Sequence, residues 1–438
     1  MKDDKSGITA LARAPEPHVR RPKAELLRRP GTLGGRLALI AVNIACVALF
    51  TSFPHAHGLV FGPYRIDLDV YRIGSRAWLD GRFLYGRLPR TMSGAKLPFT
   101  YPPLAAVLLS PLALVPMAAA SVGLTLLSIG LLALVLRVAV RSVNRAAALS
   151  PAWAGWTVWW LLPPALLLEP VRNDLAYGQI NIVLMALVAL DCLTPDAGTR
   201  WPRGCLIGIA AAVKLTPAAF VLYFVVRRDW RSAGTATGSF LVATGVGFLV
   251  AWHDSVQYWT KTLFDVSRVG GLSYAANQSI LGVLDRLGMS HPTATLAWAV
   301  ATVIVICAAW RGMSRALAAN QYCLALSLNA LAALLVSPVS WSHQWVWCVP
   351  ALLALADATL RQRAAGPAAA TALGIVLFFA GPQWWFPHGH RNELAWSGWQ
   401  QVVGSAYVFF AAAILVYAAF GMPGLAIRPA HRAVATVT

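Results

Sequence analysis

Long apolar segments alternate with short polar connections along almost the whole chain. An apolar stretch of about 17–25 residues can cross a bilayer as a helix, and lipid admits only helices or closed barrels. The pattern predicts apolar helices at residues 37–53, 117–138, 152–168, 180–194, 204–226, 235–252, 293–310, 321–338, 343–357, 367–383 and 401–420. The chain is therefore expected to be an all-α, polytopic integral membrane protein with about 10–12 transmembrane or re-entrant helices.

Two apolar segments carry interruptions that argue against a simple crossing. Residues 103–115 are bounded and broken by Pro111 and Pro116, and the segment is too short for a full span, so we expect it to be re-entrant or strongly tilted. Residues 204–226 contain Lys214-Leu215-Thr216-Pro217, a charge and a helix breaker in mid-segment. We expect its two halves to form a hairpin that does not cross the membrane.

Composition supports the membrane class. The chain has 438 residues, of which 58% are hydrophobic and 12% are charged, and its mean hydropathy is +0.60. Soluble domains are nearer one-quarter charged. The six cysteines lie in or at the ends of apolar segments without zinc-like spacing, so we expect small core residues and no disulfides.

The formal net charge of +19 reflects basic residues scattered between apolar segments, which indicates membrane topology and no nucleic-acid partner. With the N-terminus inside, the short basic loops all fall on the cytoplasmic side: Arg137, Arg141, Arg145, Arg200, Arg203, Arg227, Arg228, Arg231, Arg311, Arg315, Arg361, Arg363, Arg428 and Arg432. The opposite side then receives 54–100, 172–179, 214–217, 253–291, 337–343 and 384–400.

Three regions follow from this pattern. Residues 1–33 are expected to be a disordered basic cytoplasmic tail, because they combine arginines with several prolines. Residues 34–421 form the transmembrane domain, whose first outer loop, 54–100, carries an acidic motif. Residues 422–438 are a second cytoplasmic tail. Both termini are thus expected in the cytoplasm.

Two carboxylates, Asp67 and Asp69, stand in that first outer loop, close to the membrane boundary. An acid beside hydrocarbon is costly and is a candidate functional residue. In a helix the two side chains would diverge, whereas in a strand they would share a face. One of them is a candidate general base toward an acceptor hydroxyl. The alternative is a helix N-cap, or an ion pair with Arg65 or Arg72.

Five further residues have side chains suited to a phosphate or a sugar. Arg172 suits a phosphate, or else anchors the chain at the interface. Lys214 should face a cavity or an anion, or else pair with an internal acid. His343 could stabilise a leaving phosphate, orient an acid or serve as a polar anchor. Asn277 and Gln278 offer hydrogen bonds to a sugar, although amides are common in loops.

In their order along the chain, these motifs resemble glycosyltransferase family 87 of the GT-C superfamily, and especially the actinobacterial polyprenol-phosphate-mannose-dependent alpha-1,2-mannosyltransferases. The resemblance covers about residues 37–420. It rests on Asp67-Leu68-Asp69-Val70-Tyr71, Gly81, Leu84-Tyr85, Phe99-Thr100-Tyr101-Pro102-Pro103, Gly178-Gln179-Ile180-Asn181, Lys214-Leu215-Thr216-Pro217, Asn277-Gln278-Ser279 and Ser337-Pro338-Val339-Ser340-Trp341.

The resemblance implies a GT-C fold, a catalytic aspartate in the first outer loop and a lipid-phosphate sugar donor. The family acid stands four residues before the tyrosine, which here makes Asp67 the base. Residues in the matching motifs are implied to support the site: Asp69, Tyr71, Tyr101, Gln179, Asn181 and Trp341. The family often has two histidines after the Ser-Pro-x-Ser-Trp stretch, whereas this chain has His343 followed by Gln344.

The implied activity is inverting transfer of mannose from polyprenyl phosphate mannose to a phosphatidylinositol mannoside or lipomannan. It would occur on the periplasmic or extracellular face of the plasma membrane, among membrane lipids, without cofactor or metal. One alternative keeps the fold and uses an arabinose or glucose donor. A lipid-linked sugar flippase or transporter is another, and a structural membrane protein is the third.

Overall fold

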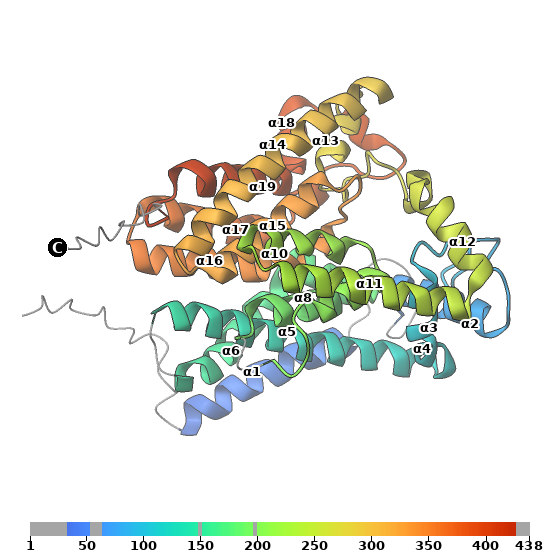
Figure 1. Ribbon diagram of the computed structural model, residues 1–438, viewed down its shortest axis with the longest axis horizontal. Helices are drawn as coiled ribbons and strands as arrows, with labels where there is room; N and C mark the ends of the chain where they lie inside the picture. Colours follow the sequence, from blue (N-terminus) through green and yellow to red (C-terminus); the bar gives the residue numbers. More distant parts are fainter. Residues whose placement is uncertain (1–32, 53–63, 148–150, 196–198, 426–438) are drawn as a thin grey trace, which may run out of the picture.

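The computed structural model describes residues 33–52, 64–147, 151–195 and 199–425, and both terminal tails, 1–32 and 426–438, lie outside it. Within the described part, regular structure is helical apart from one isolated bridge between Asn277 and Trp341. Figure 1 shows most of the longer helices running along one common direction, with α2, α3 and α12 gathered at one end of the bundle. The prediction of an all-α membrane protein is confirmed.

Four described helical segments are long and apolar enough to cross a membrane: α5 (Met117–Ala147), α11 (Trp230–Val250), α14 (His291–Ala318), and α17 (Ala365–Ala380) together with η7 (Pro382–Trp384). Two bent pairs bring the number to six: α7 (Glu169–Tyr177) with α8 (Asn181–Leu193), and α18 (Gly398–Gly404) with α19 (Ala406–Val416) and η9 (Tyr417–Gly421). Other helices in apolar segments are α1 (Leu33–Ser52), α6 (Pro151–Leu167), α10 (Val221–Arg227), α15 (Tyr322–Val336) and α16 (Cys348–Gln362).

Several predicted spans are broken in the structure. The segment 180–194 does not stand alone, because α7 precedes α8 with a bend of 119°. The segment 401–420 breaks between α18 and α19 with a bend of 67°. The segment 343–357 opens as the 3-10 helix η6 (Ser342–Trp347) before α16 begins. Residues 103–115 form only α3 (Pro103–Leu108) and α4 (Ser110–Leu114), in agreement with the prediction of a segment too short to cross.

The segment 204–226 forms the predicted hairpin. It consists of α9 (Cys205–Val213), a break at Lys214, the 3-10 helix η3 (Thr216–Phe220) and α10. Near its start, the amide of Ile207 donates to Asp191 at the end of α8 (2.9 Å). Lys214 contacts Asn181 at the start of α8, and Tyr223 returns to the end of α8 through Cys192 O (3.3 Å). The hairpin therefore runs along α8 and back, with Lys214 at its turn.

Two of the long helices present apolar side chains outward. Leu249 on α11 and Leu296 on α14 are 87% and 68% exposed, and only 22% of the most apolar stretch of either helix is buried. Apolar surface of this extent would be unfavourable in water and is favourable against lipid. These faces therefore mark where the bundle meets the bilayer.

The polar connections are folded as well. The first loop contains α2 (Ile66–Leu79), and residues 253–291 contain most of α12 (Trp252–Thr260) and all of η4 (Thr262–Phe264), η5 (Val266–Val269) and α13 (Ile280–Arg286). We call the end with α2 and α12 the cavity end (Figure 1). Arginines occupy the last turns of α10, α14 and α16, and the carbonyl of Val143 near the end of α5 accepts from Arg361 (2.8 Å). We call that opposite end the basic end.

Candidate active site

A cavity of about 710 Å³ lies at the cavity end, between α2, the hairpin turn and the loops that lead into η5 and η6. It is large enough for a small-molecule ligand. Its wall includes seven residues that the sequence analysis named as site candidates: Asp67, Tyr71, Tyr101, Gln179, Lys214, Trp341 and His343. The structure thus brings together side chains that are widely separated in the sequence.

The helix α2 resolves the question of the two acids. Because Asp67 and Asp69 are two positions apart on a helix, they point in different directions. Asp67 lines the cavity. Asp69 is buried elsewhere, where its Oδ2 accepts from the amide of Met92 (2.7 Å) and the hydroxyl of Tyr64 (3.1 Å). The N-cap position of α2 is Arg65, so neither acid is the N-cap. Asp69 therefore holds the first loop on α2 and has no place in the cavity wall.

One glutamine connects Asp67 to the tyrosines. The Nε2 of Gln179 donates to Asp67 Oδ2 (2.7 Å), and its Oε1 accepts from the hydroxyl of Tyr71 (2.7 Å). Tyr71 lies one helical turn after Asp67, which places both on the same face of α2. The hydroxyl of Tyr101 completes the group, 3.1 Å from that of Tyr71.

Gly178 makes this contact possible. Its φ of +72° ends α7 in the left-handed conformation, which glycine adopts without strain. A Cβ at this position would lie 2.8 Å from the Cβ of Leu68 and 2.9 Å from that of Arg65. The chain therefore needs glycine here both to turn and to approach α2, and the turn carries Gln179 to Asp67.

Burial raises the pKa of Asp67 to about 6, while the hydrogen bond from Gln179 and the charge of Lys214 act in the lowering direction. The helix α2 is not among the apolar helices that could cross a membrane. A carboxyl group with a pKa near 6 is mostly ionised at neutral pH and is still basic enough to accept a proton from a hydroxyl in a transition state.

A chain of hydrogen bonds fixes Lys214 beside the acid. Its Nζ donates to Asn181 Oδ1 (2.8 Å) and lies 5.2 Å from the centre of the Tyr101 ring. Asn181 in turn donates from Nδ2 to Asp174 Oδ1 (2.8 Å). Since the charge of Lys214 acts on both Asp67 and Asp174, the ammonium has an electrostatic reason for its burial. Its position leaves it available to an anion in the cavity.

His343 and Trp341 form another part of the wall. The ring of His343 packs edge-on against Tyr177, with centroids 5.5 Å apart. Its buried Nε2 has no hydrogen-bond partner in the part of the chain that the structure describes. Trp341 packs against Tyr274, with ring centroids 6.0 Å apart. A buried ring nitrogen without a protein partner is suited to a ligand in the cavity.

Three predicted binding residues lie outside the cavity wall. Arg172 donates from Nη2 to Phe379 O (3.1 Å) and lies over the Phe379 ring. Asn277 bonds to backbone, including the amide of Ser340 (2.9 Å), and Gln278 donates to the carbonyls of Ala275 and Gly404. Both amide residues are fully buried. The structure gives them a scaffolding position, in which the bridge between Asn277 and Trp341 joins two loops.

Other residues of the wall were not identified from the sequence. Arg268 on η5 lines the cavity and donates from Nη2 to Tyr85 O (3.3 Å). Thr216, Gln344 and Tyr258 also line it. Arginine in a predicted outer loop was the only sequence signal for Arg268, and it could not be separated from the loop's other basic residues.

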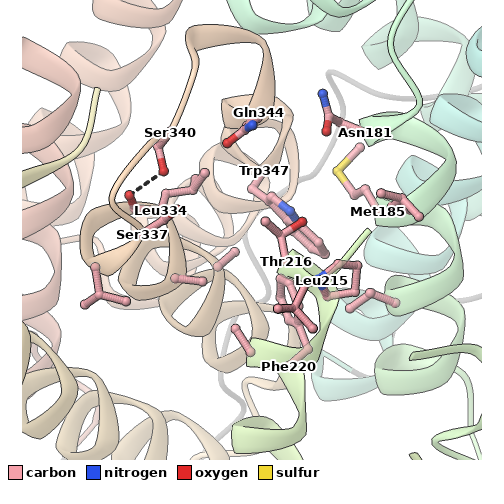
Figure 2. A pocket seen from close by; sticks show the side chains of 17 residues that line it. Asn181, Met185, Leu215, Thr216, Phe220, Leu334, Ser337, Ser340, Gln344 and Trp347 are labelled. Atoms are coloured by element: carbon pink, nitrogen blue, oxygen red, sulfur yellow. Dashed lines mark hydrogen bonds between the residues drawn. The ribbon is translucent and has the colours of Figure 1, made fainter. Parts of the chain in front are cut away.

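A second cavity of about 280 Å³ adjoins the first. It lies between α8, η3, α15 and η6, and its wall is mostly apolar, with Met185, Phe220 and Leu334 among the side chains that Figure 2 shows. The walls of the two cavities have four residues in common: Leu215, Thr216, Ser337 and Gln344. The larger cavity, whose wall carries Asp67, Lys214 and several tyrosines, and the smaller, more uniformly apolar cavity therefore meet at one junction.

Comparison with known proteins shows the family of the chain. The model of glycosyltransferase family 87 matches residues 99–338. A polyprenol-phosphate-mannose-dependent alpha-(1-2)-phosphatidylinositol mannoside mannosyltransferase from Mycobacterium tuberculosis is 43% identical over 81% of this chain and 84% of its own length. A polyprenol-phosphate-mannose-dependent alpha-(1-2)-phosphatidylinositol pentamannoside mannosyltransferase, also from M. tuberculosis, is 31% identical over 90% of this chain and 88% of its own.

A solved structure also resembles the chain. ArnT from Cupriavidus metallidurans bound to undecaprenyl phosphate aligns with 89% of this chain and 78% of that protein, at 17% identity and a TM-score of 0.41.

Proposed function

The chain belongs to glycosyltransferase family 87, and on that basis we propose that it is a polyprenol-phosphate-mannose-dependent alpha-1,2-mannosyltransferase with a phosphatidylinositol mannoside as acceptor. The relatives named above carry this donor and this type of acceptor in their names. The higher identity to the phosphatidylinositol mannoside enzyme favours that acceptor over the pentamannoside.

The observation that carries the proposal is the position of Asp67. Its carboxylate faces the cavity, is held by Gln179 and lies within electrostatic reach of Lys214. One carboxylate and one cation are what an inverting transfer from a sugar phosphate requires. The acid accepts a proton, and the cation stabilises negative charge on the departing phosphate.

The reaction can be written from these groups. Asp67 removes the proton from an acceptor hydroxyl, and the hydroxyl oxygen forms a bond to the anomeric carbon of the donor. The bond between that carbon and the phosphate oxygen breaks with its electron pair on the phosphate. Polyprenyl phosphate leaves, stabilised by Lys214 and by a hydrogen bond to His343. Attack opposite to the leaving group converts a beta-linked donor into an alpha-linked product.

The distribution of charge supports an active site on the outer face. Arginines occupy the last turns of α10, α14 and α16 at the basic end, whereas Asp67, Lys214 and the cavity lie at the other end. The first loop at the cavity end also carries arginines, including Arg76 and Arg82, but the effect of basic residues on topology weakens in a long loop. Because basic residues in short loops favour the cytoplasm, the cavity end is assigned to the periplasmic or extracellular side.

Cysteine labelling tests this orientation. Arg87 is exposed in the first loop, so Arg87→Cys, made in a variant that lacks the native cysteines, should react with a membrane-impermeant maleimide on intact cells.

The experiment compares Asp67→Asn with Asp69→Asn, at equal expression, for transfer of mannose from polyprenyl phosphate mannose to phosphatidylinositol mannosides. Asp67→Asn should lose about 10²–10⁴-fold in rate, the usual contribution of a general base. Asp69→Asn is the matched control, because the same change falls two residues away and outside the cavity wall. Full activity of Asp67→Asn would contradict the assignment of the base.

The same assay separates the alternatives. A wild-type protein that transfers arabinose or glucose, and not mannose, would keep the fold and replace the donor. A flippase would move the lipid-linked sugar across a vesicle membrane without joining it to an acceptor. The apolar wall of the second cavity does not favour a polar path through the bundle, and we therefore give the transfer reaction priority.

A further inference from the structure

The two cavities meet at a junction that matches the three parts of a lipid phosphate sugar. Such a donor has a polar sugar, an anionic phosphodiester and an apolar chain, in that order. Burying sugar hydroxyls is unfavourable unless they find polar partners, whereas burying the methylene groups of the chain is favourable. If the sugar occupies the larger cavity and the first part of the chain the smaller, the phosphate must lie at the four residues that both cavities share.

Those four residues differ in what they can offer a phosphate. Leu215 offers only an apolar surface. The hydroxyl of Ser337 is already used, since it donates to the carbonyl of Val339 (2.8 Å). The hydroxyl of Thr216 and the side-chain amide of Gln344 remain. Neither has a hydrogen-bond partner within residues 33–52, 64–147, 151–195 and 199–425, and both face the two cavities.

A cation stands at the same place. Asn181 lines the smaller cavity and Lys214 the larger, and the two are joined by a hydrogen bond of 2.8 Å. Figure 2 shows Gln344 and Asn181 toward the same end of the smaller cavity, projecting from η6 and α8 respectively. The ammonium of Lys214 and the amide of Gln344 therefore approach this end from different walls.

We propose that this junction is the subsite for the donor phosphodiester, in which Gln344 and Thr216 donate hydrogen bonds to its oxygens beside Lys214. The inference rests on the proposed function and assigns two residues to which that function gave no role. A neutral amide donates without taking up or releasing a proton, so this part of phosphate recognition should be independent of pH. The junction also determines how far the donor enters, because the phosphate stops where its partners lie.

The test separates recognition of the phosphate from recognition of the chain. Decaprenyl phosphate and decaprenol share the chain and differ in the phosphate, and each is used as an inhibitor of mannose transfer. In wild type the phosphate should inhibit far better than the alcohol. Gln344→Leu keeps a similar volume and removes the amide, and should reduce that preference about 10-fold or more, the effect of losing a hydrogen bond to a charged group.

Two further variants test how charge and hydrogen bonding at the junction change the preference for the phosphate over the alcohol. Gln344→Glu places a negative charge at the junction and should reduce the preference further than Gln344→Leu. Thr216→Val is nearly isosteric and should reduce it as well. The matched control is Gln362→Leu, since Gln362 is a partly buried glutamine at the end of α16, near Gly424 and outside both cavity walls.

The outcomes distinguish the two proposals. If wild type transfers mannose and Gln344→Leu keeps both the preference for phosphate and the KM for the donor, the junction is not the phosphate subsite. If Gln362→Leu reduces the preference equally, the effect is not local and the inference also fails. If wild type transfers no mannose but decaprenyl phosphate still binds in a Gln344-dependent way, the proposed function fails while the subsite stands.

Discussion

Gln179 offers a direct test of how the site controls its acid. The side chain donates to Asp67 Oδ2 (2.7 Å) and accepts from Tyr71 (2.7 Å). Gln179→Met keeps the length of the side chain and removes both of these hydrogen bonds, together with the longer one that Gln179 Oε1 accepts from the hydroxyl of Tyr101 (3.4 Å). Tyr71 keeps its contact with the hydroxyl of Tyr101 (3.1 Å), so the aromatic part of the wall should stay in position.

The size of the effect follows from the charge on the acceptor. A hydrogen bond to a charged group contributes about 1.5–3 kcal/mol, and one pKa unit corresponds to 1.36 kcal/mol. Gln179 acts in the lowering direction on the pKa of Asp67, which burial raises to about 6. Losing the hydrogen bond should therefore raise that pKa by about 1–2 units, to about 7–8.

The sign of the pH effect is fixed by the role of the base. Only the ionised carboxylate accepts a proton, so activity should rise with pH through the pKa of Asp67. In wild type about half of Asp67 is ionised at pH 6, whereas in Gln179→Met the ionised fraction there should be roughly 1–10%. We expect about a 5–50-fold loss of kcat/KM at pH 6 and a much smaller loss at pH 9.

The assay is kcat/KM for mannose transfer in detergent between pH 5 and pH 9, which reports the free enzyme. The matched control is Gln401→Met. Gln401 is also buried, but its amide donates to the backbone carbonyls of Arg286 and Glu393, away from the cavity wall. An equal loss at every pH, with the acidic midpoint unmoved, would refute the electrostatic role of Gln179.

Two further predictions concern stability and backbone geometry. Burial raises the pKa of Asp67 from 3.8 to about 6, so its ionised form destabilises the folded state increasingly from about pH 4 to pH 6 and fully above that. Asp67→Asn should thus raise the melting temperature at pH 7.5, because the free energy of unfolding should increase by up to about 3 kcal/mol. This stabilisation should disappear toward pH 4. An unchanged or lower melting temperature at pH 7.5 would contradict the prediction. Gly178→Ala should cost about 1–2 kcal/mol of stability from its positive φ, and should also lose transfer activity because the new Cβ would meet Leu68 and Arg65. Gly81→Ala controls for the backbone term, since Gly81 has a φ of +67° and open space around it, and equal activity of the two variants would argue against a close approach at Gly178.

Much of the fold was readable from local signals. Apolar segments of sufficient length predicted the helices, and the mid-segment charge and proline predicted the hairpin turn at Lys214. The choice of Asp67 over Asp69 rested on the family pattern of an acid four residues before a tyrosine, and once the segment is known to be a helix that spacing puts Asp67 and Tyr71 on one face. In each case the property depends on residues within one or two helical turns.

The roles of the polar loop residues were not readable in this way. Asn277 and Gln278 have the side chains of sugar-binding residues, but their partners are backbone amide and carbonyl groups up to 126 positions away. The contact that occupies Arg172, Phe379 O, lies 207 positions along the chain. A sequence shows which donors and acceptors a segment carries, but it does not show which are already used by distant backbone. For the same reason Gln344 could not be recognised as free for a ligand.

The residues that stabilise the ammonium of Lys214 are synthesised before it. Asn181 precedes Lys214 by 33 positions, and at 5–20 residues per second the ribosome makes that length in roughly 2–7 s. Asp67 and Asp174 precede Asn181 in the chain and are therefore synthesised even earlier. When the hairpin enters the membrane, the groups that offset its ammonium are thus already synthesised. A lysine that would cost about 2.5–3.5 kcal/mol against bare lipid is inserted beside its partners, so loss of Asn181 should impair biogenesis as well as catalysis.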